Sequence, residues 1–155
     1  MSLRAGFKQT RMLPFVALGA LILAACVSGA TEESSSGAQV VGQVVPVEGG
    51  GQYIDIIPSE LAVMLADKDF YFVNVHIPFE GELPETDAFI PFNEIAENID
   101  RFPMDKDAKI VLYCRSGSMS ASAARELVAR GFTNVYNLDG GFRAWEAAGY
   151  EFIEP

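Results

Sequence analysis

Cys114 is the residue whose surroundings in the sequence most clearly indicate covalent chemistry. It follows the apolar run at residues 109–113 and precedes the mostly small residues 115–120. A lone cysteine is commonly an inert core residue, but a polar strand-to-helix turn is not its usual place. Backbone N–H groups of such a turn, with the N-terminus of a helix behind them, favour an anion and stabilise a thiolate. The sequence therefore predicts a reactive thiol at Cys114.

His76 is the single histidine of the chain and follows the mostly apolar run at residues 70–75. Two interpretations of this residue stay open. In the first, His76 lies at the rim of the site, as a proton donor or as a contact for an anion. In the second, it is a strand-end residue that is hydrogen-bonded to a neighbouring loop.

Metal binding is the less favoured chemistry for these side chains, and we predict no metal site. Cys114, His76 and Met119 would be soft ligands for copper if they converged, but that hypothesis rests on residue types alone. An acidic segment follows His76, and its spacing lacks the alternation of a calcium-binding loop, so we expect it to be a solvated loop. Its carboxylates are those of Glu80, Glu82, Glu85 and Asp87.

The elements that must position these side chains alternate between strands and helices. Strands are predicted at residues 53–56, 70–75, 109–113 and 134–138, and helices at residues 58–66, 92–101, 121–130 and 140–147. This order predicts an α/β fold in which a central parallel sheet carries helices on both faces. The ligand site of such a sheet lies beyond the carboxyl ends of its strands, where Cys114 falls. Trp145 is expected to fill the core.

The start of the chain has the pattern of an export signal. Basic residues precede a run of fourteen residues, 12–25, without a polar or charged side chain, and this run is shorter than the roughly 20 residues of a spanning helix. Leu-Ala-Ala-Cys at residues 23–26 resembles the lipobox of bacterial lipoproteins. The resemblance implies a signal peptide at 1–25, lipidation of Cys26, and a protein anchored on the extracytoplasmic face of the cell membrane. An ordinary signal peptide with an incidental cysteine is the alternative.

Residues 26–51 are predicted to be the lipidated Cys26 and a flexible linker, and residues 52–155 the folded domain. A short strand at Val40-Val41 and Val44-Val45 is a less favoured alternative, because Gly42, Pro46 and Gly49 flank it. Ser-Ser-Ser-Gly at 34–37 and Gly-Gly-Gly at 49–51 are typical of a tether. The net charge of −10 and the pI of about 4.4 exclude a basic nucleic-acid binder. Two cysteines allow at most one disulfide, which excludes a disulfide-stapled scaffold.

The sequence Tyr-Cys-Arg-Ser-Gly-Ser-Met-Ser at residues 113–120, together with the helix that follows, resembles the active-site loop of single-domain rhodaneses, which are sulfurtransferases. Residues 135–141, with Trp145 and Gly149, are similar to the Gly-Gly and Trp segment of that family. The resemblance covers about residues 53–153. It implies the rhodanese-like three-layer domain, with helices on both faces of the sheet.

The resemblance also implies a reaction. Cys114 would attack the outer sulfur of a thiosulfate, polysulfide or persulfide donor, become a persulfide, and pass that sulfur to a thiol or another thiophilic acceptor. Substrate would be bound by His76 and by the loop residues Arg115, Ser116, Gly117, Ser118, Met119 and Ser120. No metal or organic cofactor is implied. The partners would be the small donor, the acceptor and the membrane, with no nucleic acid, and we expect a monomer.

The chain departs from the family pattern at positions that concern the donor. Many rhodaneses have Asp-Val-Arg where Asn-Val-His stands at 74–76, many have Arg at the position of Met119, and residues 78–87 replace a Gly-His-Ile-Pro stretch. These changes remove cationic groups, which disfavours thiosulfate, a dianion, as the natural donor.

Three other functions compete with sulfur transfer. A cysteine phosphatase needs an arginine six residues after its cysteine, and Ser120 occupies that position. A rhodanese-like module without turnover could carry sulfur passively or dock a partner. A thiol redox sensor is the third alternative, because Cys114 has no intramolecular partner if Cys26 is acylated.

Overall fold

The computed structural model describes residues 42–155, so the predicted signal peptide, Cys26 and the first part of the linker lie outside the described residues. Residues 42–155 form one six-stranded sheet with the order β1-β2-β6-β5-β3-β4. The strands are β1 (Gln43–Pro46), β2 (Gln52–Ile56), β3 (Tyr71–Asn74), β4 (Ala88–Phe89), β5 (Ile110–Tyr113) and β6 (Val135–Leu138). β1 pairs with β2 in antiparallel fashion, and the other neighbours are parallel, which confirms the α/β class.

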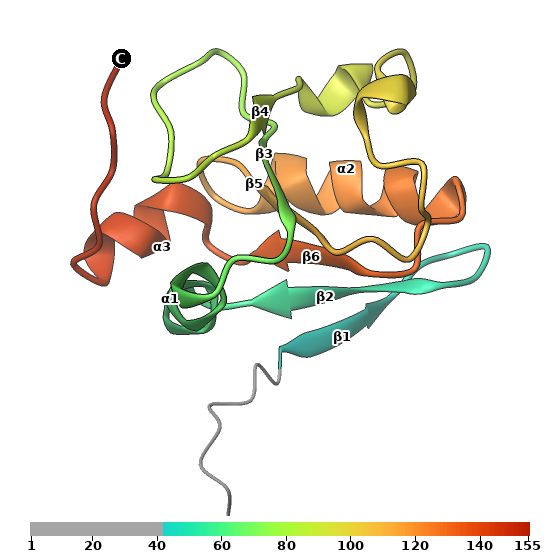
Figure 1. The fold of residues 1–155 in the computed structure, drawn as a ribbon, viewed down its shortest axis with the longest axis horizontal. Coiled ribbons are helices and arrows are strands. Elements are labelled where there is room, and N and C mark those ends of the chain that lie inside the picture. The colour runs from blue at the N-terminus through green and yellow to red at the C-terminus, as the bar shows by residue number, and fades with distance from the viewer. Residues whose placement is uncertain (1–41) are drawn as a thin grey trace, which may run out of the picture. The chain divides into compact units, whose positions relative to one another are not determined.

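Three α-helices and two 3-10 turns cover the sheet in the described part of the chain (Figure 1). They are α1 (Pro58–Ala66), η1 (Phe92–Glu94), η2 (Ile99–Arg101), α2 (Ser118–Ala129) and α3 (Gly141–Ala147). None of the helices in residues 42–155 has the length and apolar character that crossing a bilayer requires.

The side chains of β5 alternate between two hydrophobic clusters, one on each face of the sheet. Ile110, Leu112 and then Cys114 join the cluster that includes residues of α2 and of the segment around the 3-10 turns. Val111 and Tyr113 join the other cluster, which includes residues of α1 and α3, Trp145 among them. Because both faces of this central strand are covered, its sequence is continuously apolar. The strand therefore delivers Cys114 at its carboxyl end, beside the start of α2.

The sheet begins earlier than the sequence predicted. Residues 43–46 were assigned to the flexible linker, but they form the edge strand β1, and the glycines at 49–51 belong to the turn of a hairpin. Val47 N–H donates to Gly51 O and Gly50 N–H donates to Val47 O, both at 3.0 Å. All three glycines have positive φ angles. Composition alone does not separate such a turn from a tether, because glycine suits both.

The helix predicted at 92–101 is wrong, because this stretch contains two 3-10 turns, η1 and η2. They are joined near Asn98, whose side-chain amide donates to the Glu94 carbonyl at 2.9 Å. Asparagine favours such local side-chain bonds, which compete with helix continuation. The next helix, α2, is longer at its N-terminus than the sequence predicted. It begins at Ser118 rather than at 121, so the turn after Cys114 is only three residues long.

Candidate active site

Cys114 lies at the base of a cavity of about 370 Å³ at the carboxyl end of the central strands. Cys114 is a free cysteine, and only 1% of its surface is exposed to solvent. It nevertheless belongs to the lining of the cavity. The cavity is lined by His76, Ile77, Pro78, Cys114, Arg115, Ser116, Ser118, Met119 and Arg143. A small molecule in the cavity can therefore reach Cys114, whereas the bulk solvent barely touches it.

The turn after Cys114 is held from behind by the first residues of α3. Phe142 N–H donates to Cys114 O at 2.9 Å, and Arg143 N–H donates to Arg115 O at 3.2 Å. The approach is so close that a Cβ atom on Gly141 would lie 2.1 Å from Cys114 O. The Gly-Gly pair that the sequence interpretation treated as a helix start thus fixes the carbonyl groups of the turn.

The backbone N–H groups of this turn and of the first residues of α2 have no hydrogen-bond partner among the described residues. Within residues 42–155, none of the six backbone N–H groups from 115 to 120 donates a hydrogen bond to another protein group. The helical bonds of α2 begin with Ala121 N–H, which donates to Gly117 O at 2.9 Å. Unpaired N–H groups at a helix N-terminus and in the preceding turn provide donors for an anion.

Ser120 contacts the sulfur directly. Its hydroxyl lies 3.4 Å from Cys114 Sγ, which it faces as a donor, and 3.1 Å from Gly117 O. The side chain is fully buried. A phosphatase would place an arginine at this position to clamp phosphoryl oxygens, so the structure offers a small buried hydroxyl where that chemistry needs a guanidinium.

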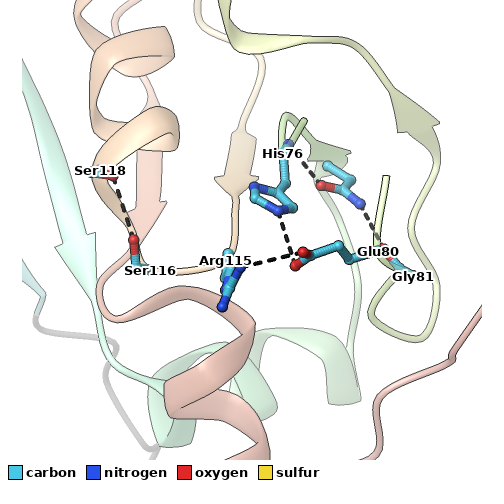
Figure 2. A network of polar contacts seen from close by, with 7 residues as sticks. His76, Glu80, Gly81, Arg115, Ser116 and Ser118 are labelled. Carbon is cyan, nitrogen blue, oxygen red and sulfur yellow. Dashed lines mark hydrogen bonds and ion pairs between the residues drawn. The ribbon is translucent and has the colours of Figure 1, made fainter. Parts of the chain in front are cut away.

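His76, Glu80 and Arg115 form a polar network (Figure 2), of which His76 and Arg115 line the cavity. His76 Nε2 lies 3.1 Å from Glu80 Oε2, and Arg115 Nη1 donates to Glu80 Oε1 at 3.3 Å. Asn74 positions this network, because its side chain accepts from His76 N–H at 3.0 Å and donates to Gly81 O at 2.9 Å. His76 is hydrogen-bonded to a neighbouring loop, as the second interpretation expected, and it also lines the cavity; its role as a proton donor or anion contact stays a prediction.

The acidic segment is more structured than the solvated loop that the sequence predicted. Glu80 belongs to the network just described. Asp87 pairs with Lys68 at 2.7 Å and accepts the N–H of Phe72 at 2.7 Å. Glu82 forms a backbone bridge with Ile153. The prediction of a solvated loop failed because the partners of these acidic side chains lie in distant segments of the chain, which the local sequence does not reveal.

Arg143 was missed by the sequence interpretation, although it lines the cavity from α3. Among the described residues its guanidinium forms no ion pair, whereas that of Arg115 is paired with Glu80. Its only sequence signal is its place directly after Gly140-Gly141-Phe142. Met119 contributes an apolar part of the lining. In the described part of the chain no three His, Cys, Asp or Glu side chains are grouped as metal ligands.

Comparison with known proteins agrees with this architecture. A model of the rhodanese-like domain matches residues 72–148. A sulfurtransferase of Allochromatium vinosum is 33% identical over 105 residues, which are 65% of this chain and 95% of that protein. The chain belongs to the rhodanese family of sulfurtransferases.

Other rhodanese relatives match over varying lengths. A thiosulfate sulfurtransferase GlpE of Pseudoalteromonas translucida is 49% identical over 59 residues, 37% of this chain and 56% of that relative. A solved rhodanese-like domain protein from Staphylococcus aureus is 28% identical with a TM-score of 0.54, over 65% of this chain and 98% of its own. A rhodanese-related protein from Thermoplasma volcanium is 26% identical with a TM-score of 0.55, over 64% and 96%.

The family match at 72–148 includes the residues that line the cavity, among them His76, the turn after Cys114, and Arg143. It leaves out β1, β2 and α1, which complete the sheet and one of its hydrophobic clusters.

Proposed function

We propose that this rhodanese domain transfers sulfane sulfur through a persulfide on Cys114. The Cys114 thiolate attacks the outer sulfur of a donor, the bond between that sulfur and the rest of the donor breaks, and the leaving group departs with the electron pair. A thiophilic acceptor then attacks the outer sulfur of the persulfide, and Cys114 leaves as a thiolate. The observation that carries this proposal is the cavity at Cys114, which is lined by residues of a turn whose backbone N–H groups have no hydrogen-bond partner within residues 42–155.

The surroundings of Cys114 support both half-reactions. Both steps leave negative charge on sulfur or on the departing group, and fixed N–H donors stabilise such charge without reorganisation. Arg143 adds a guanidinium that has no ion pair within the described residues, and Arg115 adds one that is shared with Glu80. These cations support an anionic donor such as thiosulfate, polysulfide or a persulfide, and they compensate for the positive charges missing at His76 and Met119.

Intact mass spectrometry tests the persulfide. Incubation of the protein with thiosulfate or polysulfide should add the mass of one sulfur atom, and peptide analysis should place it on Cys114. The variant Cys114→Ser should gain no sulfur at this position and should lose sulfur transfer to an acceptor. Transfer that persists in this variant would defeat the proposal. Loading of Cys114 without release to any acceptor would instead indicate a passive sulfur carrier.

We also propose that the protein is exported and anchored in the membrane by a lipid on Cys26. The basic segment, the apolar run at 12–25 and the Leu-Ala-Ala-Cys sequence support this proposal. Two or more acyl chains hold a protein stably on a bilayer, whereas one does so only marginally. Cys26→Ser should move the protein from the membrane fraction to the soluble fraction after cell lysis. Retention of the variant by an uncleaved N-terminal segment would contradict lipidation.

A further inference from the structure

Glu80 fixes the hydrogen-bonding state of the His76 ring. Its carboxylate faces the guanidinium of Arg115 with one oxygen and Nε2 of His76 with the other, at 3.3 and 3.1 Å. An ionised carboxylate only accepts hydrogen bonds, so Nε2 carries the hydrogen in this arrangement. In the neutral ring Nδ1 then holds a lone pair. The tautomer follows from the partners rather than from an observed hydrogen.

Nδ1 of His76 is a buried polar atom that has no hydrogen-bond partner within the described residues. The residue is 5% exposed, and its ring packs edge-on against Phe142 with centroids 5.5 Å apart. In Figure 2 the ring lies between Glu80 and the loop that carries Arg115, with its second nitrogen turned away from Glu80. Buried polar atoms are rarely left unpaired in proteins. Because the ring lines the cavity, a donor brought by the substrate would complete its bonding.

The other charged groups around the cavity have no lone pair that is free to accept a hydrogen bond from a substrate. Arg115 and Arg143 only donate hydrogen bonds, and the carboxylate of Glu80 is engaged by two partners. Glu80 is the charged partner of the His76 ring, and Arg115, Cys114 and Arg143 line the same cavity as His76. Among the residues that line the cavity, His76 is the one whose side chain has a buried nitrogen without a hydrogen-bond partner in residues 42–155.

We propose that His76 is the proton acceptor for a protonated thiol that receives sulfur from the Cys114 persulfide, with Glu80 as its positioning residue. This inference rests on the proposed function and specifies its acceptor class. The thiol gives its proton to Nδ1, its sulfur attacks the outer sulfur of the persulfide, and a new S–S bond forms. The old S–S bond breaks with its electron pair on Cys114. The acceptor thiol is oxidised to a persulfide, the persulfide on Cys114 is reduced to a thiolate, and the proton passes from His76 to solvent.

Single-turnover unloading of the sulfur-loaded full-length protein tests this step. Two acceptors are compared: 2-mercaptoethanol, an alkyl thiol that is mostly protonated near neutral pH, and thionitrobenzoate, an aryl thiol that is already ionised. In His76→Phe the aromatic packing against Phe142 is kept and both nitrogens are lost. General-base catalysis typically contributes about 10²–10⁴-fold. We therefore expect unloading by the alkyl thiol to slow at least about tenfold, and unloading by the aryl thiolate to stay within about twofold.

Glu80→Gln provides a second variant with nearly the same shape. Its neutral amide can donate to Nε2 and so place the hydrogen on Nδ1, which removes the lone pair from the cavity. We expect the same selective loss of unloading by the alkyl thiol. Glu82→Gln, a matched change two residues away whose side chain is outside the network, should behave as the parent protein.

The outcomes separate this inference from the proposed function. Unchanged unloading by the alkyl thiol in His76→Phe, or equal slowing with both acceptors in His76→Phe and Glu80→Gln, would overturn the role of His76 while Cys114 still loads with sulfur. Failure of the parent protein to load Cys114 would instead overturn the proposed function.

Discussion

At the proposed donor site of this rhodanese, the positive charge comes from a different element than a strand-end arginine. His76 occupies that strand-end position, and its ring is bonded to Glu80. Arg115 is 42% exposed in its side chain and shares the same carboxylate, which offsets part of its charge. Arg143 lines the cavity from α3 and has no ion pair among residues 42–155. We therefore expect Arg143 to provide the main side-chain attraction for an anionic donor.

Arg143→Ala should weaken the use of thiosulfate more than the use of an uncharged donor. A hydrogen bond to a charged group typically contributes about 1.5–3 kcal/mol, so KM for thiosulfate should rise about tenfold or more. Loading of Cys114 by a neutral dialkyl trisulfide should change by less than about threefold. Arg130→Ala is the control, since Arg130 pairs with Glu126 at the end of α2. Equal effects on both donors would show that Arg143 acts on the structure of the site rather than on donor charge.

At the scale of elements, the start of α3 decides how the turn after Cys114 is held. Two N–H groups of α3 bind the carbonyls of Cys114 and Arg115, and this contact requires Gly141 to lie against the backbone of the turn. Gly141 has a φ of +59°, in the region that glycine adopts without strain. With its carbonyls tied to α3, the turn keeps its own N–H groups unpaired. The resemblance to the family's Gly-Gly segment thus reflects a packing requirement at the active site.

Gly141→Ala should damage the site more than a glycine substitution elsewhere. The added Cβ would lie 2.1 Å from Cys114 O and 2.7 Å from Arg115 O, so the turn or α3 must move. Such overpacking typically costs about 1–3 kcal/mol of stability, and we expect sulfur loading to fall more than tenfold. Gly131→Ala is a matched control, with a φ of +88° and no atom within 4 Å of the added Cβ. In denaturation experiments that variant should lose only about 1–2 kcal/mol of unfolding free energy. Its rate of sulfur loading, followed by mass spectrometry, should be unchanged. Equal loss of loading in both variants would contradict the packing argument.

The sequence predicted those elements whose own residues carry a strong signal. β5 is a continuous apolar run, and α1 begins at a proline that suits the first turn of a helix. Both were predicted nearly at their observed bounds, as was the placement of Cys114 between β5 and α2. The start of α2 was missed because Ser-Met-Ser at 118–120 has a modest helix propensity and was interpreted as loop.

The features that the sequence did not predict depend on contacts between distant segments. β1 is a strand because it pairs with β2, and β4 is only two residues long beside β3. Glu80 meets Arg115, 35 residues away, and Arg143 reaches the cavity only because α3 packs against the turn. No local periodicity encodes such a meeting of segments. The positions of Cys114, His76 and Arg115 at one site could therefore be predicted from the sequence, whereas the contributions of Glu80 and Arg143 could not.

At the scale of the whole molecule, the segment that carries Glu80 is tied to several distant parts of the chain. The Tyr113 hydroxyl, at the end of β5, accepts from Leu83 N–H at 3.0 Å and lies 2.7 Å from Thr86 Oγ1. Glu82 and Ile153 exchange two backbone hydrogen bonds of 2.9 Å, which connect the segment to the C-terminal residues. The position of the segment that carries His76 and Glu80 thus depends on contacts with the central strand β5 and with the C-terminal residues.

Tyr113→Phe removes the hydroxyl that contacts this segment, and it should lower the free energy of unfolding by an amount that depends on pH. Burial raises the pKa of Tyr113 to about 12, above the value of about 10 of an unfolded tyrosine. The folded protein therefore binds more protons than the unfolded chain above about pH 10, and up to about 2–3 kcal/mol of stability, fully present below that pH, is lost as the pH rises to about 12. At about pH 8 the variant should be less stable by about 1–3 kcal/mol, because Leu83 N–H loses its acceptor. Urea denaturation should show this gap narrowing by about 1 kcal/mol between about pH 9 and 11, since phenylalanine does not titrate. A gap that stays constant over this range, or one that Tyr136→Phe reproduces, would disprove the assignment to Tyr113.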